Sequence, residues 1–266
     1  MTTSIETKFN QDFQKLQQHL TLKGLQQSSI VSYSHGVRRI ARYFDYHIYD
    51  LSEQKLTDYF TDLLITHSWS SLKLDLYGLK FFYRFVLNEK WPHIDLIKSP
   101  RALKIPNIIT TSEASRIFRS TRVVSYRVFF FTVYSLGLRI SEGLRLEVGD
   151  IDSHRMRVHV RDSKGNKDRL VPLPVVTLDV LRRFWSIHRN PTLLFPNRKG
   201  GLQCSHVATT PLSQAGVSKA LSVVATACGI KKRSLCTLYG TAMRHISLSL
   251  VLIYLKCNKF LVTAAF

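Results

Sequence analysis

The chain has 266 residues, of which 45% are hydrophobic, so it is long enough for two domains with sizeable cores. It carries 38 Lys and Arg against 18 Asp and Glu, a formal net charge of +20. This excess favours a polyanionic partner such as nucleic acid, although a ribosome-like or membrane-surface basic protein would share it. The four cysteines lack metal-ligand spacing. The polar N-terminal sequence argues against secretion, and the apolar run 246–255 is too short to span a membrane. We therefore expect a cytoplasmic protein with no metal site and no membrane contact.

Residues 7–92 are predicted to form a small helical bundle. Four stripes of apolar side chains recur at helical spacing, beginning near Phe9, Ile30, Leu56 and Leu76. The connections between the stripes are short, which is typical of helices that pack against one another.

Basic residues of this bundle are mixed with aromatic ones. The candidate DNA contacts are Arg38, Arg39, Arg42 and Lys80. Each of them alone is better explained as part of a solvated basic face over an aromatic core. As a set on a strongly basic chain, contact with a DNA backbone is about as well supported.

Residues 93–106 break the helical pattern and are predicted to link two domains. Pro100 and Pro106 flank basic residues there, and Lys104 is a further candidate DNA contact. Thr110 and Glu113 then form a capping-box signature for a new helix, so we expect a second domain over 107–266.

The second domain mixes helices with a small hairpin. Residues 156–160 and 168–174 predict two strands around turn-forming residues, and 178–187 and 213–230 predict helices, the last with Gly229 as its stop. The expected fold class is mainly α with a small antiparallel β-sheet, that is α+β.

Arg139 follows an apolar run over residues 128–138, where a charged side chain needs a partner. Glu142, three residues later on a helix, could be that partner. Alternatively, the guanidinium could bind a phosphate from a rigid, half-buried position. Arg139 alone does not decide between these interpretations.

The turn of the hairpin carries two lysines. Lys164 or Lys167 could protonate a departing oxygen or contact a phosphate while the strands stay fixed. Considered alone, an ordinary polar hairpin tip is the simpler interpretation.

The order of these features resembles the tyrosine recombinase family, which includes the phage integrases. A helical bundle, a basic linker, the sequence LGLRISE and the hairpin SKGNKDRLVPL carry the resemblance, which covers about residues 7–235. It implies a core-binding domain followed by a catalytic domain, which together clamp double-stranded DNA and commonly act as a homotetramer.

The resemblance also implies a mechanism. A tyrosine attacks the scissile phosphate to give a 3′-phosphotyrosine, two arginines stabilise the charge, and a hairpin lysine protonates the 5′-oxygen. Arg139 matches the first arginine and Lys164 the lysine, and no metal, nucleotide or other cofactor is needed.

Residues 231–266 depart from the family pattern. The family has an H-x-L-R-H-S box, then L-G-H and the nucleophilic tyrosine, whereas this chain offers only Arg244-His245 with the wrong neighbours. Tyr239 and Tyr254 lack the family context, so no nucleophile is assigned.

A change of reading frame accounts for this departure. If the codons are read one base earlier, starting from the third base of the Cys236 codon, the stretch up to Ala265 can encode H-T-L-R-H-S-Y-A-T-H-L-I-E-S-G-F-D-L-S-Q-V-Q-Q-I-L-G-H-S-S. This reading contains the missing box and L-G-H. We therefore predict that the catalytic domain is truncated in effect, with 231–266 out of frame. Lys231-Lys232 can be encoded by a run of A, so programmed slippage, a mutation and a sequencing error all remain open.

Three functional hypotheses follow. By family, the chain is a site-specific recombinase or integrase of a mobile element, but as written we expect no strand cleavage. It could instead be a non-catalytic DNA-binding remnant or decoy. A misfolded remnant is the third alternative, because the missing segment contributes core helices in the family.

Overall fold

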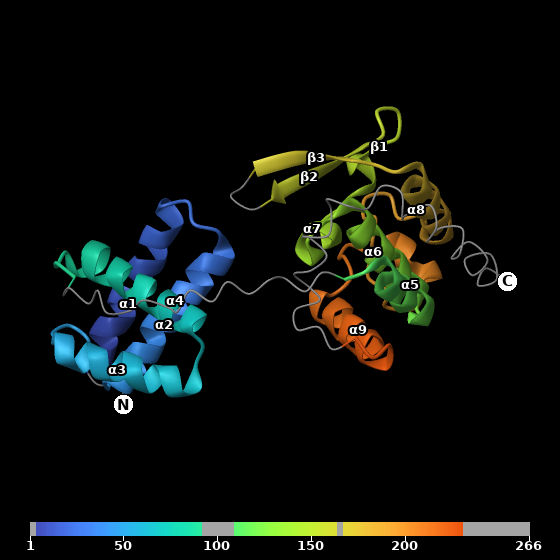
Figure 1. The fold of residues 1–266 in the computed structure, drawn as a ribbon. Coiled ribbons are helices and arrows are strands. Elements are labelled where there is room, and N and C mark those ends of the chain that lie inside the picture. Colours follow the sequence, from blue (N-terminus) through green and yellow to red (C-terminus); the bar gives the residue numbers. More distant parts are fainter. Residues whose placement is uncertain (1–3, 92–108, 164–166, 231–266) are drawn as a thin grey trace. The chain divides into compact units, whose positions relative to one another are not determined.

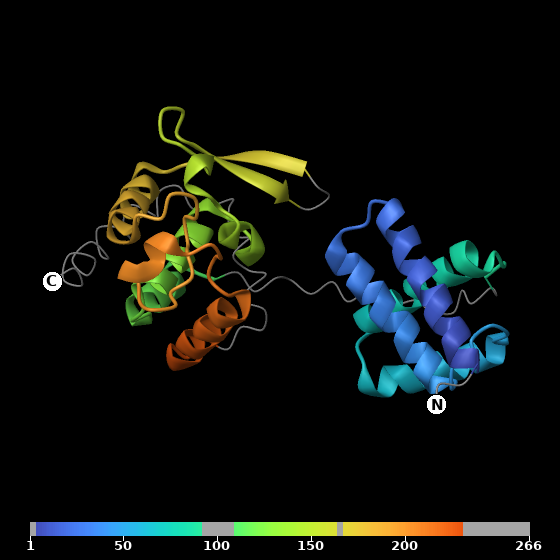
Figure 2. The ribbon, with the colours of Figure 1, turned by 180° about the vertical axis from the view of Figure 1, so that it is seen from behind.

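The computed structural model describes residues 4–91, 109–163 and 167–230. The chain divides into two compact units, Met1–Leu103 and Lys104–Phe266 (Figures 1 and 2). Helices dominate the described part of both units, and a three-stranded antiparallel sheet lies in the second, which confirms the predicted fold class. The predicted linker, 93–106, and the tail, 231–266, lie outside the described residues.

Residues 4–91 of the N-terminal unit contain four α-helices, as the apolar stripes predict: α1 (Ser4–Leu22), α2 (Gln27–Tyr43), α3 (Glu53–Thr66) and α4 (Trp69–Phe82). Ser52 and Ser68 cap α3 and α4, because each side chain accepts a hydrogen bond from a main-chain N–H three residues later. A π-helical turn, η1 (Tyr83–Leu87), follows α4. The stripes form one aromatic-rich core.

Two glycines let α2 and α4 cross closely. A Cβ on Gly36 would lie 2.7 Å from the Cα of Asp75, and one on Gly78 would lie 2.8 Å from the carbonyl oxygen of Tyr33. Asp75 is buried at this crossing, where Arg39 and the Tyr59 hydroxyl donate to it over 3.2 and 3.1 Å. Burial raises the pKa of Asp75, and Arg39 opposes that rise.

Gly36→Ala is therefore expected to destabilise the bundle by about 1–3 kcal/mol. The added methyl group must displace the backbone of α4, and this overpacking outweighs the gain of up to about 1 kcal/mol in helix propensity. Urea unfolding followed by circular dichroism measures the loss, and amide hydrogen exchange assigns it to the N-terminal unit. Gly149→Ala is the control, because a Cβ there meets nothing within 4 Å. A bundle as stable as wild type would contradict this close packing.

The second unit begins with α5 (Thr111–Ser120), α6 (Val124–Leu136) and α7 (Ile140–Leu144). The Thr110–Glu113 capping box is present at the start of α5. The other elements described in the second unit are η2 (Val148–Asp150), β1 (Ile151–Asp152), β2 (Arg157–Ser163), β3 (Lys167–Pro172), α8 (Val175–His188), η3 (Gln203–Val207) and α9 (Gln214–Ala227). Helix α6 is buried on nearly all sides and forms the centre of the core.

The strand order β1-β2-β3 places the longest strand in the middle of the sheet. Strand β2 extends further than the alternating run 156–160 predicts, because Ser163 pairs with Lys167 beyond an irregularity in register after Val160. The hairpin therefore reaches beyond the apolar alternation that the sequence shows.

Candidate nucleic-acid interface

Arg139 stands at a sharp change of backbone direction. Helix α6 ends at Leu136 and is capped by Gly137, whose φ of +59° suits glycine, and the buried Leu138 then leads directly to Arg139 at the start of α7. The main-chain N–H of Arg139 donates to Oε2 of Glu142 over 2.8 Å, and Nη1 donates to Oε1 over 2.6 Å. The backbone and the guanidinium of Arg139 are thus both fixed by one carboxylate.

Glu142 is buried, with 2% of its side chain exposed, whereas 51% of the Arg139 side chain is exposed. The ion pair that the sequence suggests therefore forms, and Arg139 still presents much of its surface to solvent. Nη2 of Arg169, on β3, donates to Oε2 of Glu142 over 2.8 Å. Two arginines from different elements thus meet at one buried carboxylate.

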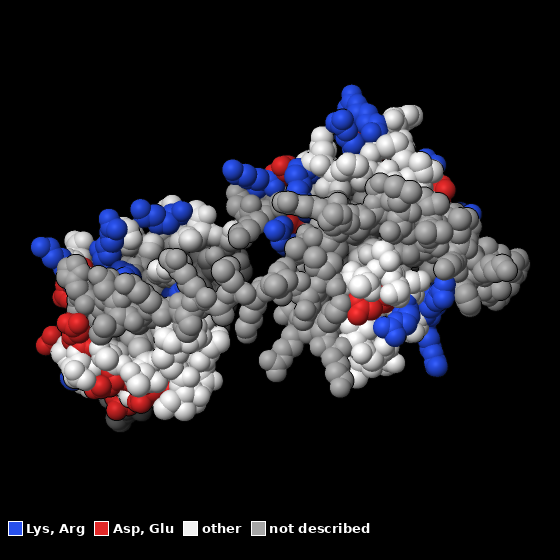
Figure 3. All heavy atoms as spheres, viewed as in Figure 1, with Lys and Arg blue, Asp and Glu red and all other residues white. Residues whose placement is uncertain are grey.

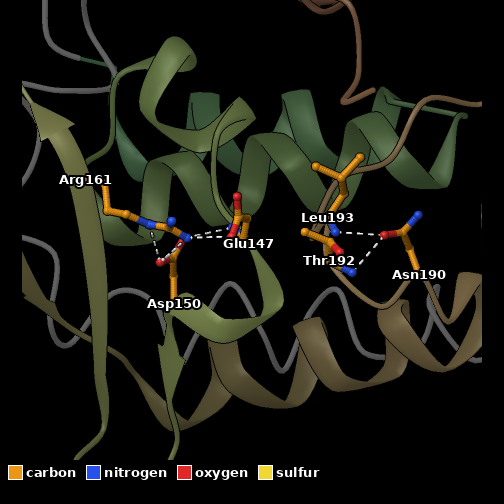
Figure 4. A network of polar contacts seen from close by, with 6 residues as sticks. All are labelled: Glu147, Asp150, Arg161, Asn190, Thr192 and Leu193. Carbon is orange, nitrogen blue, oxygen red and sulfur yellow. Dashed lines mark hydrogen bonds and ion pairs between the residues drawn. The ribbon is translucent and has the colours of Figure 1, made fainter. Parts of the chain in front are cut away.

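The hairpin is also anchored through its other strand. Arg161 on β2 donates from Nε to Oδ1 of Asp150 over 2.8 Å and from Nη2 to Glu147 over 2.7 Å (Figure 4). These hydrogen bonds, with that to Glu147 the stronger influence, raise the pKa of Arg161. Asp150 is itself buried and accepts from the main-chain N–H of Glu147. Both strands of the hairpin are therefore tied to the segment that follows Arg139.

The predicted hairpin lysines differ in what the structure shows of them. Lys164 lies outside the described residues, as does Lys104. Lys167 is the first residue of β3 and is exposed. The assignment of these three residues to DNA or to catalysis stays a prediction.

The four basic residues singled out in the bundle have different surroundings. Arg39 is ion-paired with the buried Asp75, and 35% of its side chain is exposed. The guanidinium of Arg38 lies over the Phe13 ring at 4.3 Å, and the Lys80 ammonium lies 5.9 Å from the Trp91 ring. Arg42 is exposed near the end of α2. Arg39 thus supports the helix crossing, and the other three remain on or near the surface.

Two cations share an aromatic ring at η1. Lys23 and Arg84 both lie over the ring of Phe85, at 4.8 and 5.2 Å. Arg84 stands among aromatic residues in the sequence, whereas the sequence reasoning missed Lys23 and the ring that the two cations share. In the view of Figure 3, basic side chains of this unit gather away from the acidic side chains over α3. On this face the basic and acidic side chains of the bundle thus occupy different areas, even though the bundle has nearly equal numbers of acidic and basic residues.

Within the described ranges, no group of three or more His, Cys, Asp or Glu is arranged to hold a metal ion. None of the helices in those ranges is long and apolar enough to cross a membrane.

Comparison with known families matches both units. Residues 13–93 match the N-terminal SAM-like domain of phage integrases, and residues 103–249 match the phage integrase family. The second match covers more than half of the chain, so the chain belongs to the phage integrase family of tyrosine recombinases.

Individual relatives agree with this family. The integrase/recombinase y4eF of Sinorhizobium fredii is 32% identical over 157 residues, which are 59% of this chain and 58% of the relative. Tyrosine recombinase XerA of Thermococcus kodakarensis is 29% identical over 66% of this chain and 61% of the relative. The matched part thus spans about three fifths of the length of these relatives.

Solved structures of the family share the fold at low sequence identity. A lambda integrase (75–356) dimer bound to a COC′ core site has a TM-score of 0.67 at 14% identity and covers 96% of this chain and 89% of that one. XerH recombinase bound to its difH substrate has a TM-score of 0.59 at 16% identity, covering 88% of this chain and 71% of that one.

Proposed function

We propose that this chain binds double-stranded DNA and that Arg139 contacts a backbone phosphate. The observation that carries the proposal is an arginine whose side chain is half exposed while its guanidinium is bonded to a buried carboxylate, in a chain of net charge +20. Arginine in a fixed orientation suits a phosphate, because its planar donors match two phosphate oxygens. The DNA-bound relatives named above support this choice of partner.

The family activity, site-specific recombination or integration through a phosphotyrosine, is the enzymatic part of the proposal. In that reaction Arg139 stabilises the negative charge of the phosphate and Lys164 protonates the leaving 5′-oxygen. A mobile element is the expected genetic setting, a homotetramer on paired sites the expected assembly, and the cytoplasm the expected location. The chain as written is proposed to bind without cutting, because 231–266 offers neither the second arginine nor a nucleophile in the family context.

Arg139→Ala is expected to weaken binding to duplex DNA about 5- to 20-fold at low salt. It removes one charge-assisted phosphate contact, so the slope of log K against log salt should fall in magnitude by about 0.9. The other basic residues should keep the remaining binding strongly dependent on salt. Fluorescence anisotropy with a labelled duplex at several salt concentrations measures both quantities.

Arg155→Ala is the matched control for charge. Arg155 belongs to the same unit, and 80% of its side chain is exposed, with a carboxylate oxygen of Asp152 3.9 Å from its guanidinium. We expect its replacement to change affinity about twofold or less. A wild-type chain that binds no duplex even at low salt would contradict the proposed function.

A further inference from the structure

Arg169 is held close to Arg139 by strand register. It pairs directly with Val160 on β2 and lies two residues before Val171 on β3, and both valines are buried. Directly paired residues, and residues two apart on a strand, share one face of a sheet. Arg169 therefore points from the buried face of the hairpin toward α7, where it reaches Glu142.

The carboxylate of Glu142 connects the two arginines. Oε1 accepts from Nη1 of Arg139, whereas Oε2 accepts from both the main-chain N–H of Arg139 and Nη2 of Arg169. Since Glu142 is buried, its rotamer is restricted, and the bond from Arg169 restrains it further. Without Arg169, Oε2 becomes accessible to a second N–H of the Arg139 guanidinium, and such a two-bond fork would draw Arg139 away from solvent.

We propose that Arg169 is a positioning residue for the Arg139 phosphate site: it holds Oε2 of Glu142 and thereby keeps Arg139 turned toward a bound phosphate. This role rests on the proposed function, because it concerns the same phosphate site.

The test is a double-mutant cycle on binding to a labelled duplex. Arg169→Gln is measured in the wild-type chain and in Arg139→Ala. We expect about a fivefold loss of affinity in the wild-type background and less than about twofold in Arg139→Ala, because the contact that Arg169 supports is then already absent.

Arg161→Gln is the matched control. It removes the same charge from the same hairpin and breaks an ion pair with another buried carboxylate, that of Asp150. Weaker anchoring of the hairpin would affect both variants alike, whereas only Arg169→Gln should be coupled to Arg139. Equal losses from Arg169→Gln in the two backgrounds would overturn the proposal.

A second measurement applies if Arg169→Gln does not fold. Arg169→Lys keeps the positive charge but bonds from a different position, so the side-chain Nε–H resonance of Arg139 should shift in its NMR spectrum. Arg161→Lys should leave that resonance in place. An unchanged Arg139 resonance in Arg169→Lys would overturn the proposal. If the wild-type chain does not bind duplex DNA, the proposed function itself is wrong. If the chain binds but the losses of affinity from the two substitutions simply add, only the role of Arg169 is wrong.

Discussion

A gene whose reading frame is restored between the codons of Ile230 and Cys236 is expected to yield a protein that forms a covalent adduct with DNA. The 266-residue chain should form none. The restored frame supplies a second arginine within H-T-L-R-H-S and then L-G-H, after which the family has its nucleophilic tyrosine. A single oxyanion-binding group contributes about 10²–10³ in rate, and the adduct itself requires the nucleophile.

The measurement uses a nicked suicide substrate, from which the cleaved end is lost, and denaturing electrophoresis to detect protein-linked DNA. The matched control is Arg139→Ala in the restored frame, which keeps the tyrosine and should lose nearly all of the adduct. An adduct formed by the chain as written would contradict the proposed lack of catalysis.

The source of the frame change can be tested separately. If the codons of Lys231-Lys232 form a run of A, intact mass of the expressed product should reveal a minor, frame-restored species. Synonymous codons that interrupt the run should abolish that species. If the gene has no A-run there, slippage has no basis, and a mutation or a sequencing error is the remaining explanation of the frame change.

The elements that were predicted well are those with a regular apolar pattern. The four stripes of the bundle became α1–α4, because a helix with one apolar face must bury that face against others. The Thr110–Glu113 box worked because a capping box is a local interaction that needs no tertiary partner. The Arg139–Glu142 ion pair could be predicted for the same reason, since its two residues lie only three positions apart in the sequence.

The contacts that were missed join residues far apart in the chain. Arg169 reaches Glu142 across 27 residues, and Arg39 reaches Asp75 across 36. The sequence offers only a weak signal for each: an arginine on the apolar side of a strand, and an aspartate within the apolar stripe of a helix. Which acid meets which base depends on strand register and helix crossing, and local spacing does not determine these.

A second large effect is expected at Asn190, which lies just beyond α8 and is 1% exposed. Its Oδ1 accepts from the main-chain N–H groups of Thr192 and Leu193 over 3.0 and 2.7 Å (Figure 4). Its Nδ2 donates to the carbonyl oxygens of Ser205, His206 and Ala208 over 2.9, 3.3 and 2.9 Å. One buried amide thus joins the end of α8 to the η3 segment.

The backbone of Asn190 is fixed as well. Its N–H donates to Nδ1 of His188 over 3.1 Å, and Nε1 of Trp185 donates to its carbonyl oxygen over 2.9 Å. Burial lowers the pKa of His188 to about 4, so its ring is neutral near pH 7 and Nδ1 can accept. These bonds hold the backbone of residue 190 in place. When the side chain is shortened, the backbone therefore cannot move in to fill the space that the amide leaves.

Asn190→Ala is accordingly expected to lower the free energy of unfolding of the second unit by about 3–4 kcal/mol, because five main-chain groups lose their bond to one buried amide at once. Urea unfolding measures the loss, and hydrogen exchange assigns it to the second unit. Asn197→Ala is the control, because the hydrogen bonds described for Asn197 use its main-chain N–H and carbonyl oxygen. A loss below about 1 kcal/mol at Asn190 would show that water replaces the amide.

The effect of Asn190→Ala on DNA binding shows whether Asn190 supports the fold or contacts the DNA. Asn190 ties down the segment that leads to Phe195, whose ring packs against Phe129 of α6. Helix α6 ends just before Arg139, so loosening Asn190 weakens the framework of the phosphate site without touching its residues. At a temperature where Asn190→Ala is still folded, its salt slope should match wild type, because every phosphate contact remains. A reduced slope in the folded variant would place Asn190 in the interface itself.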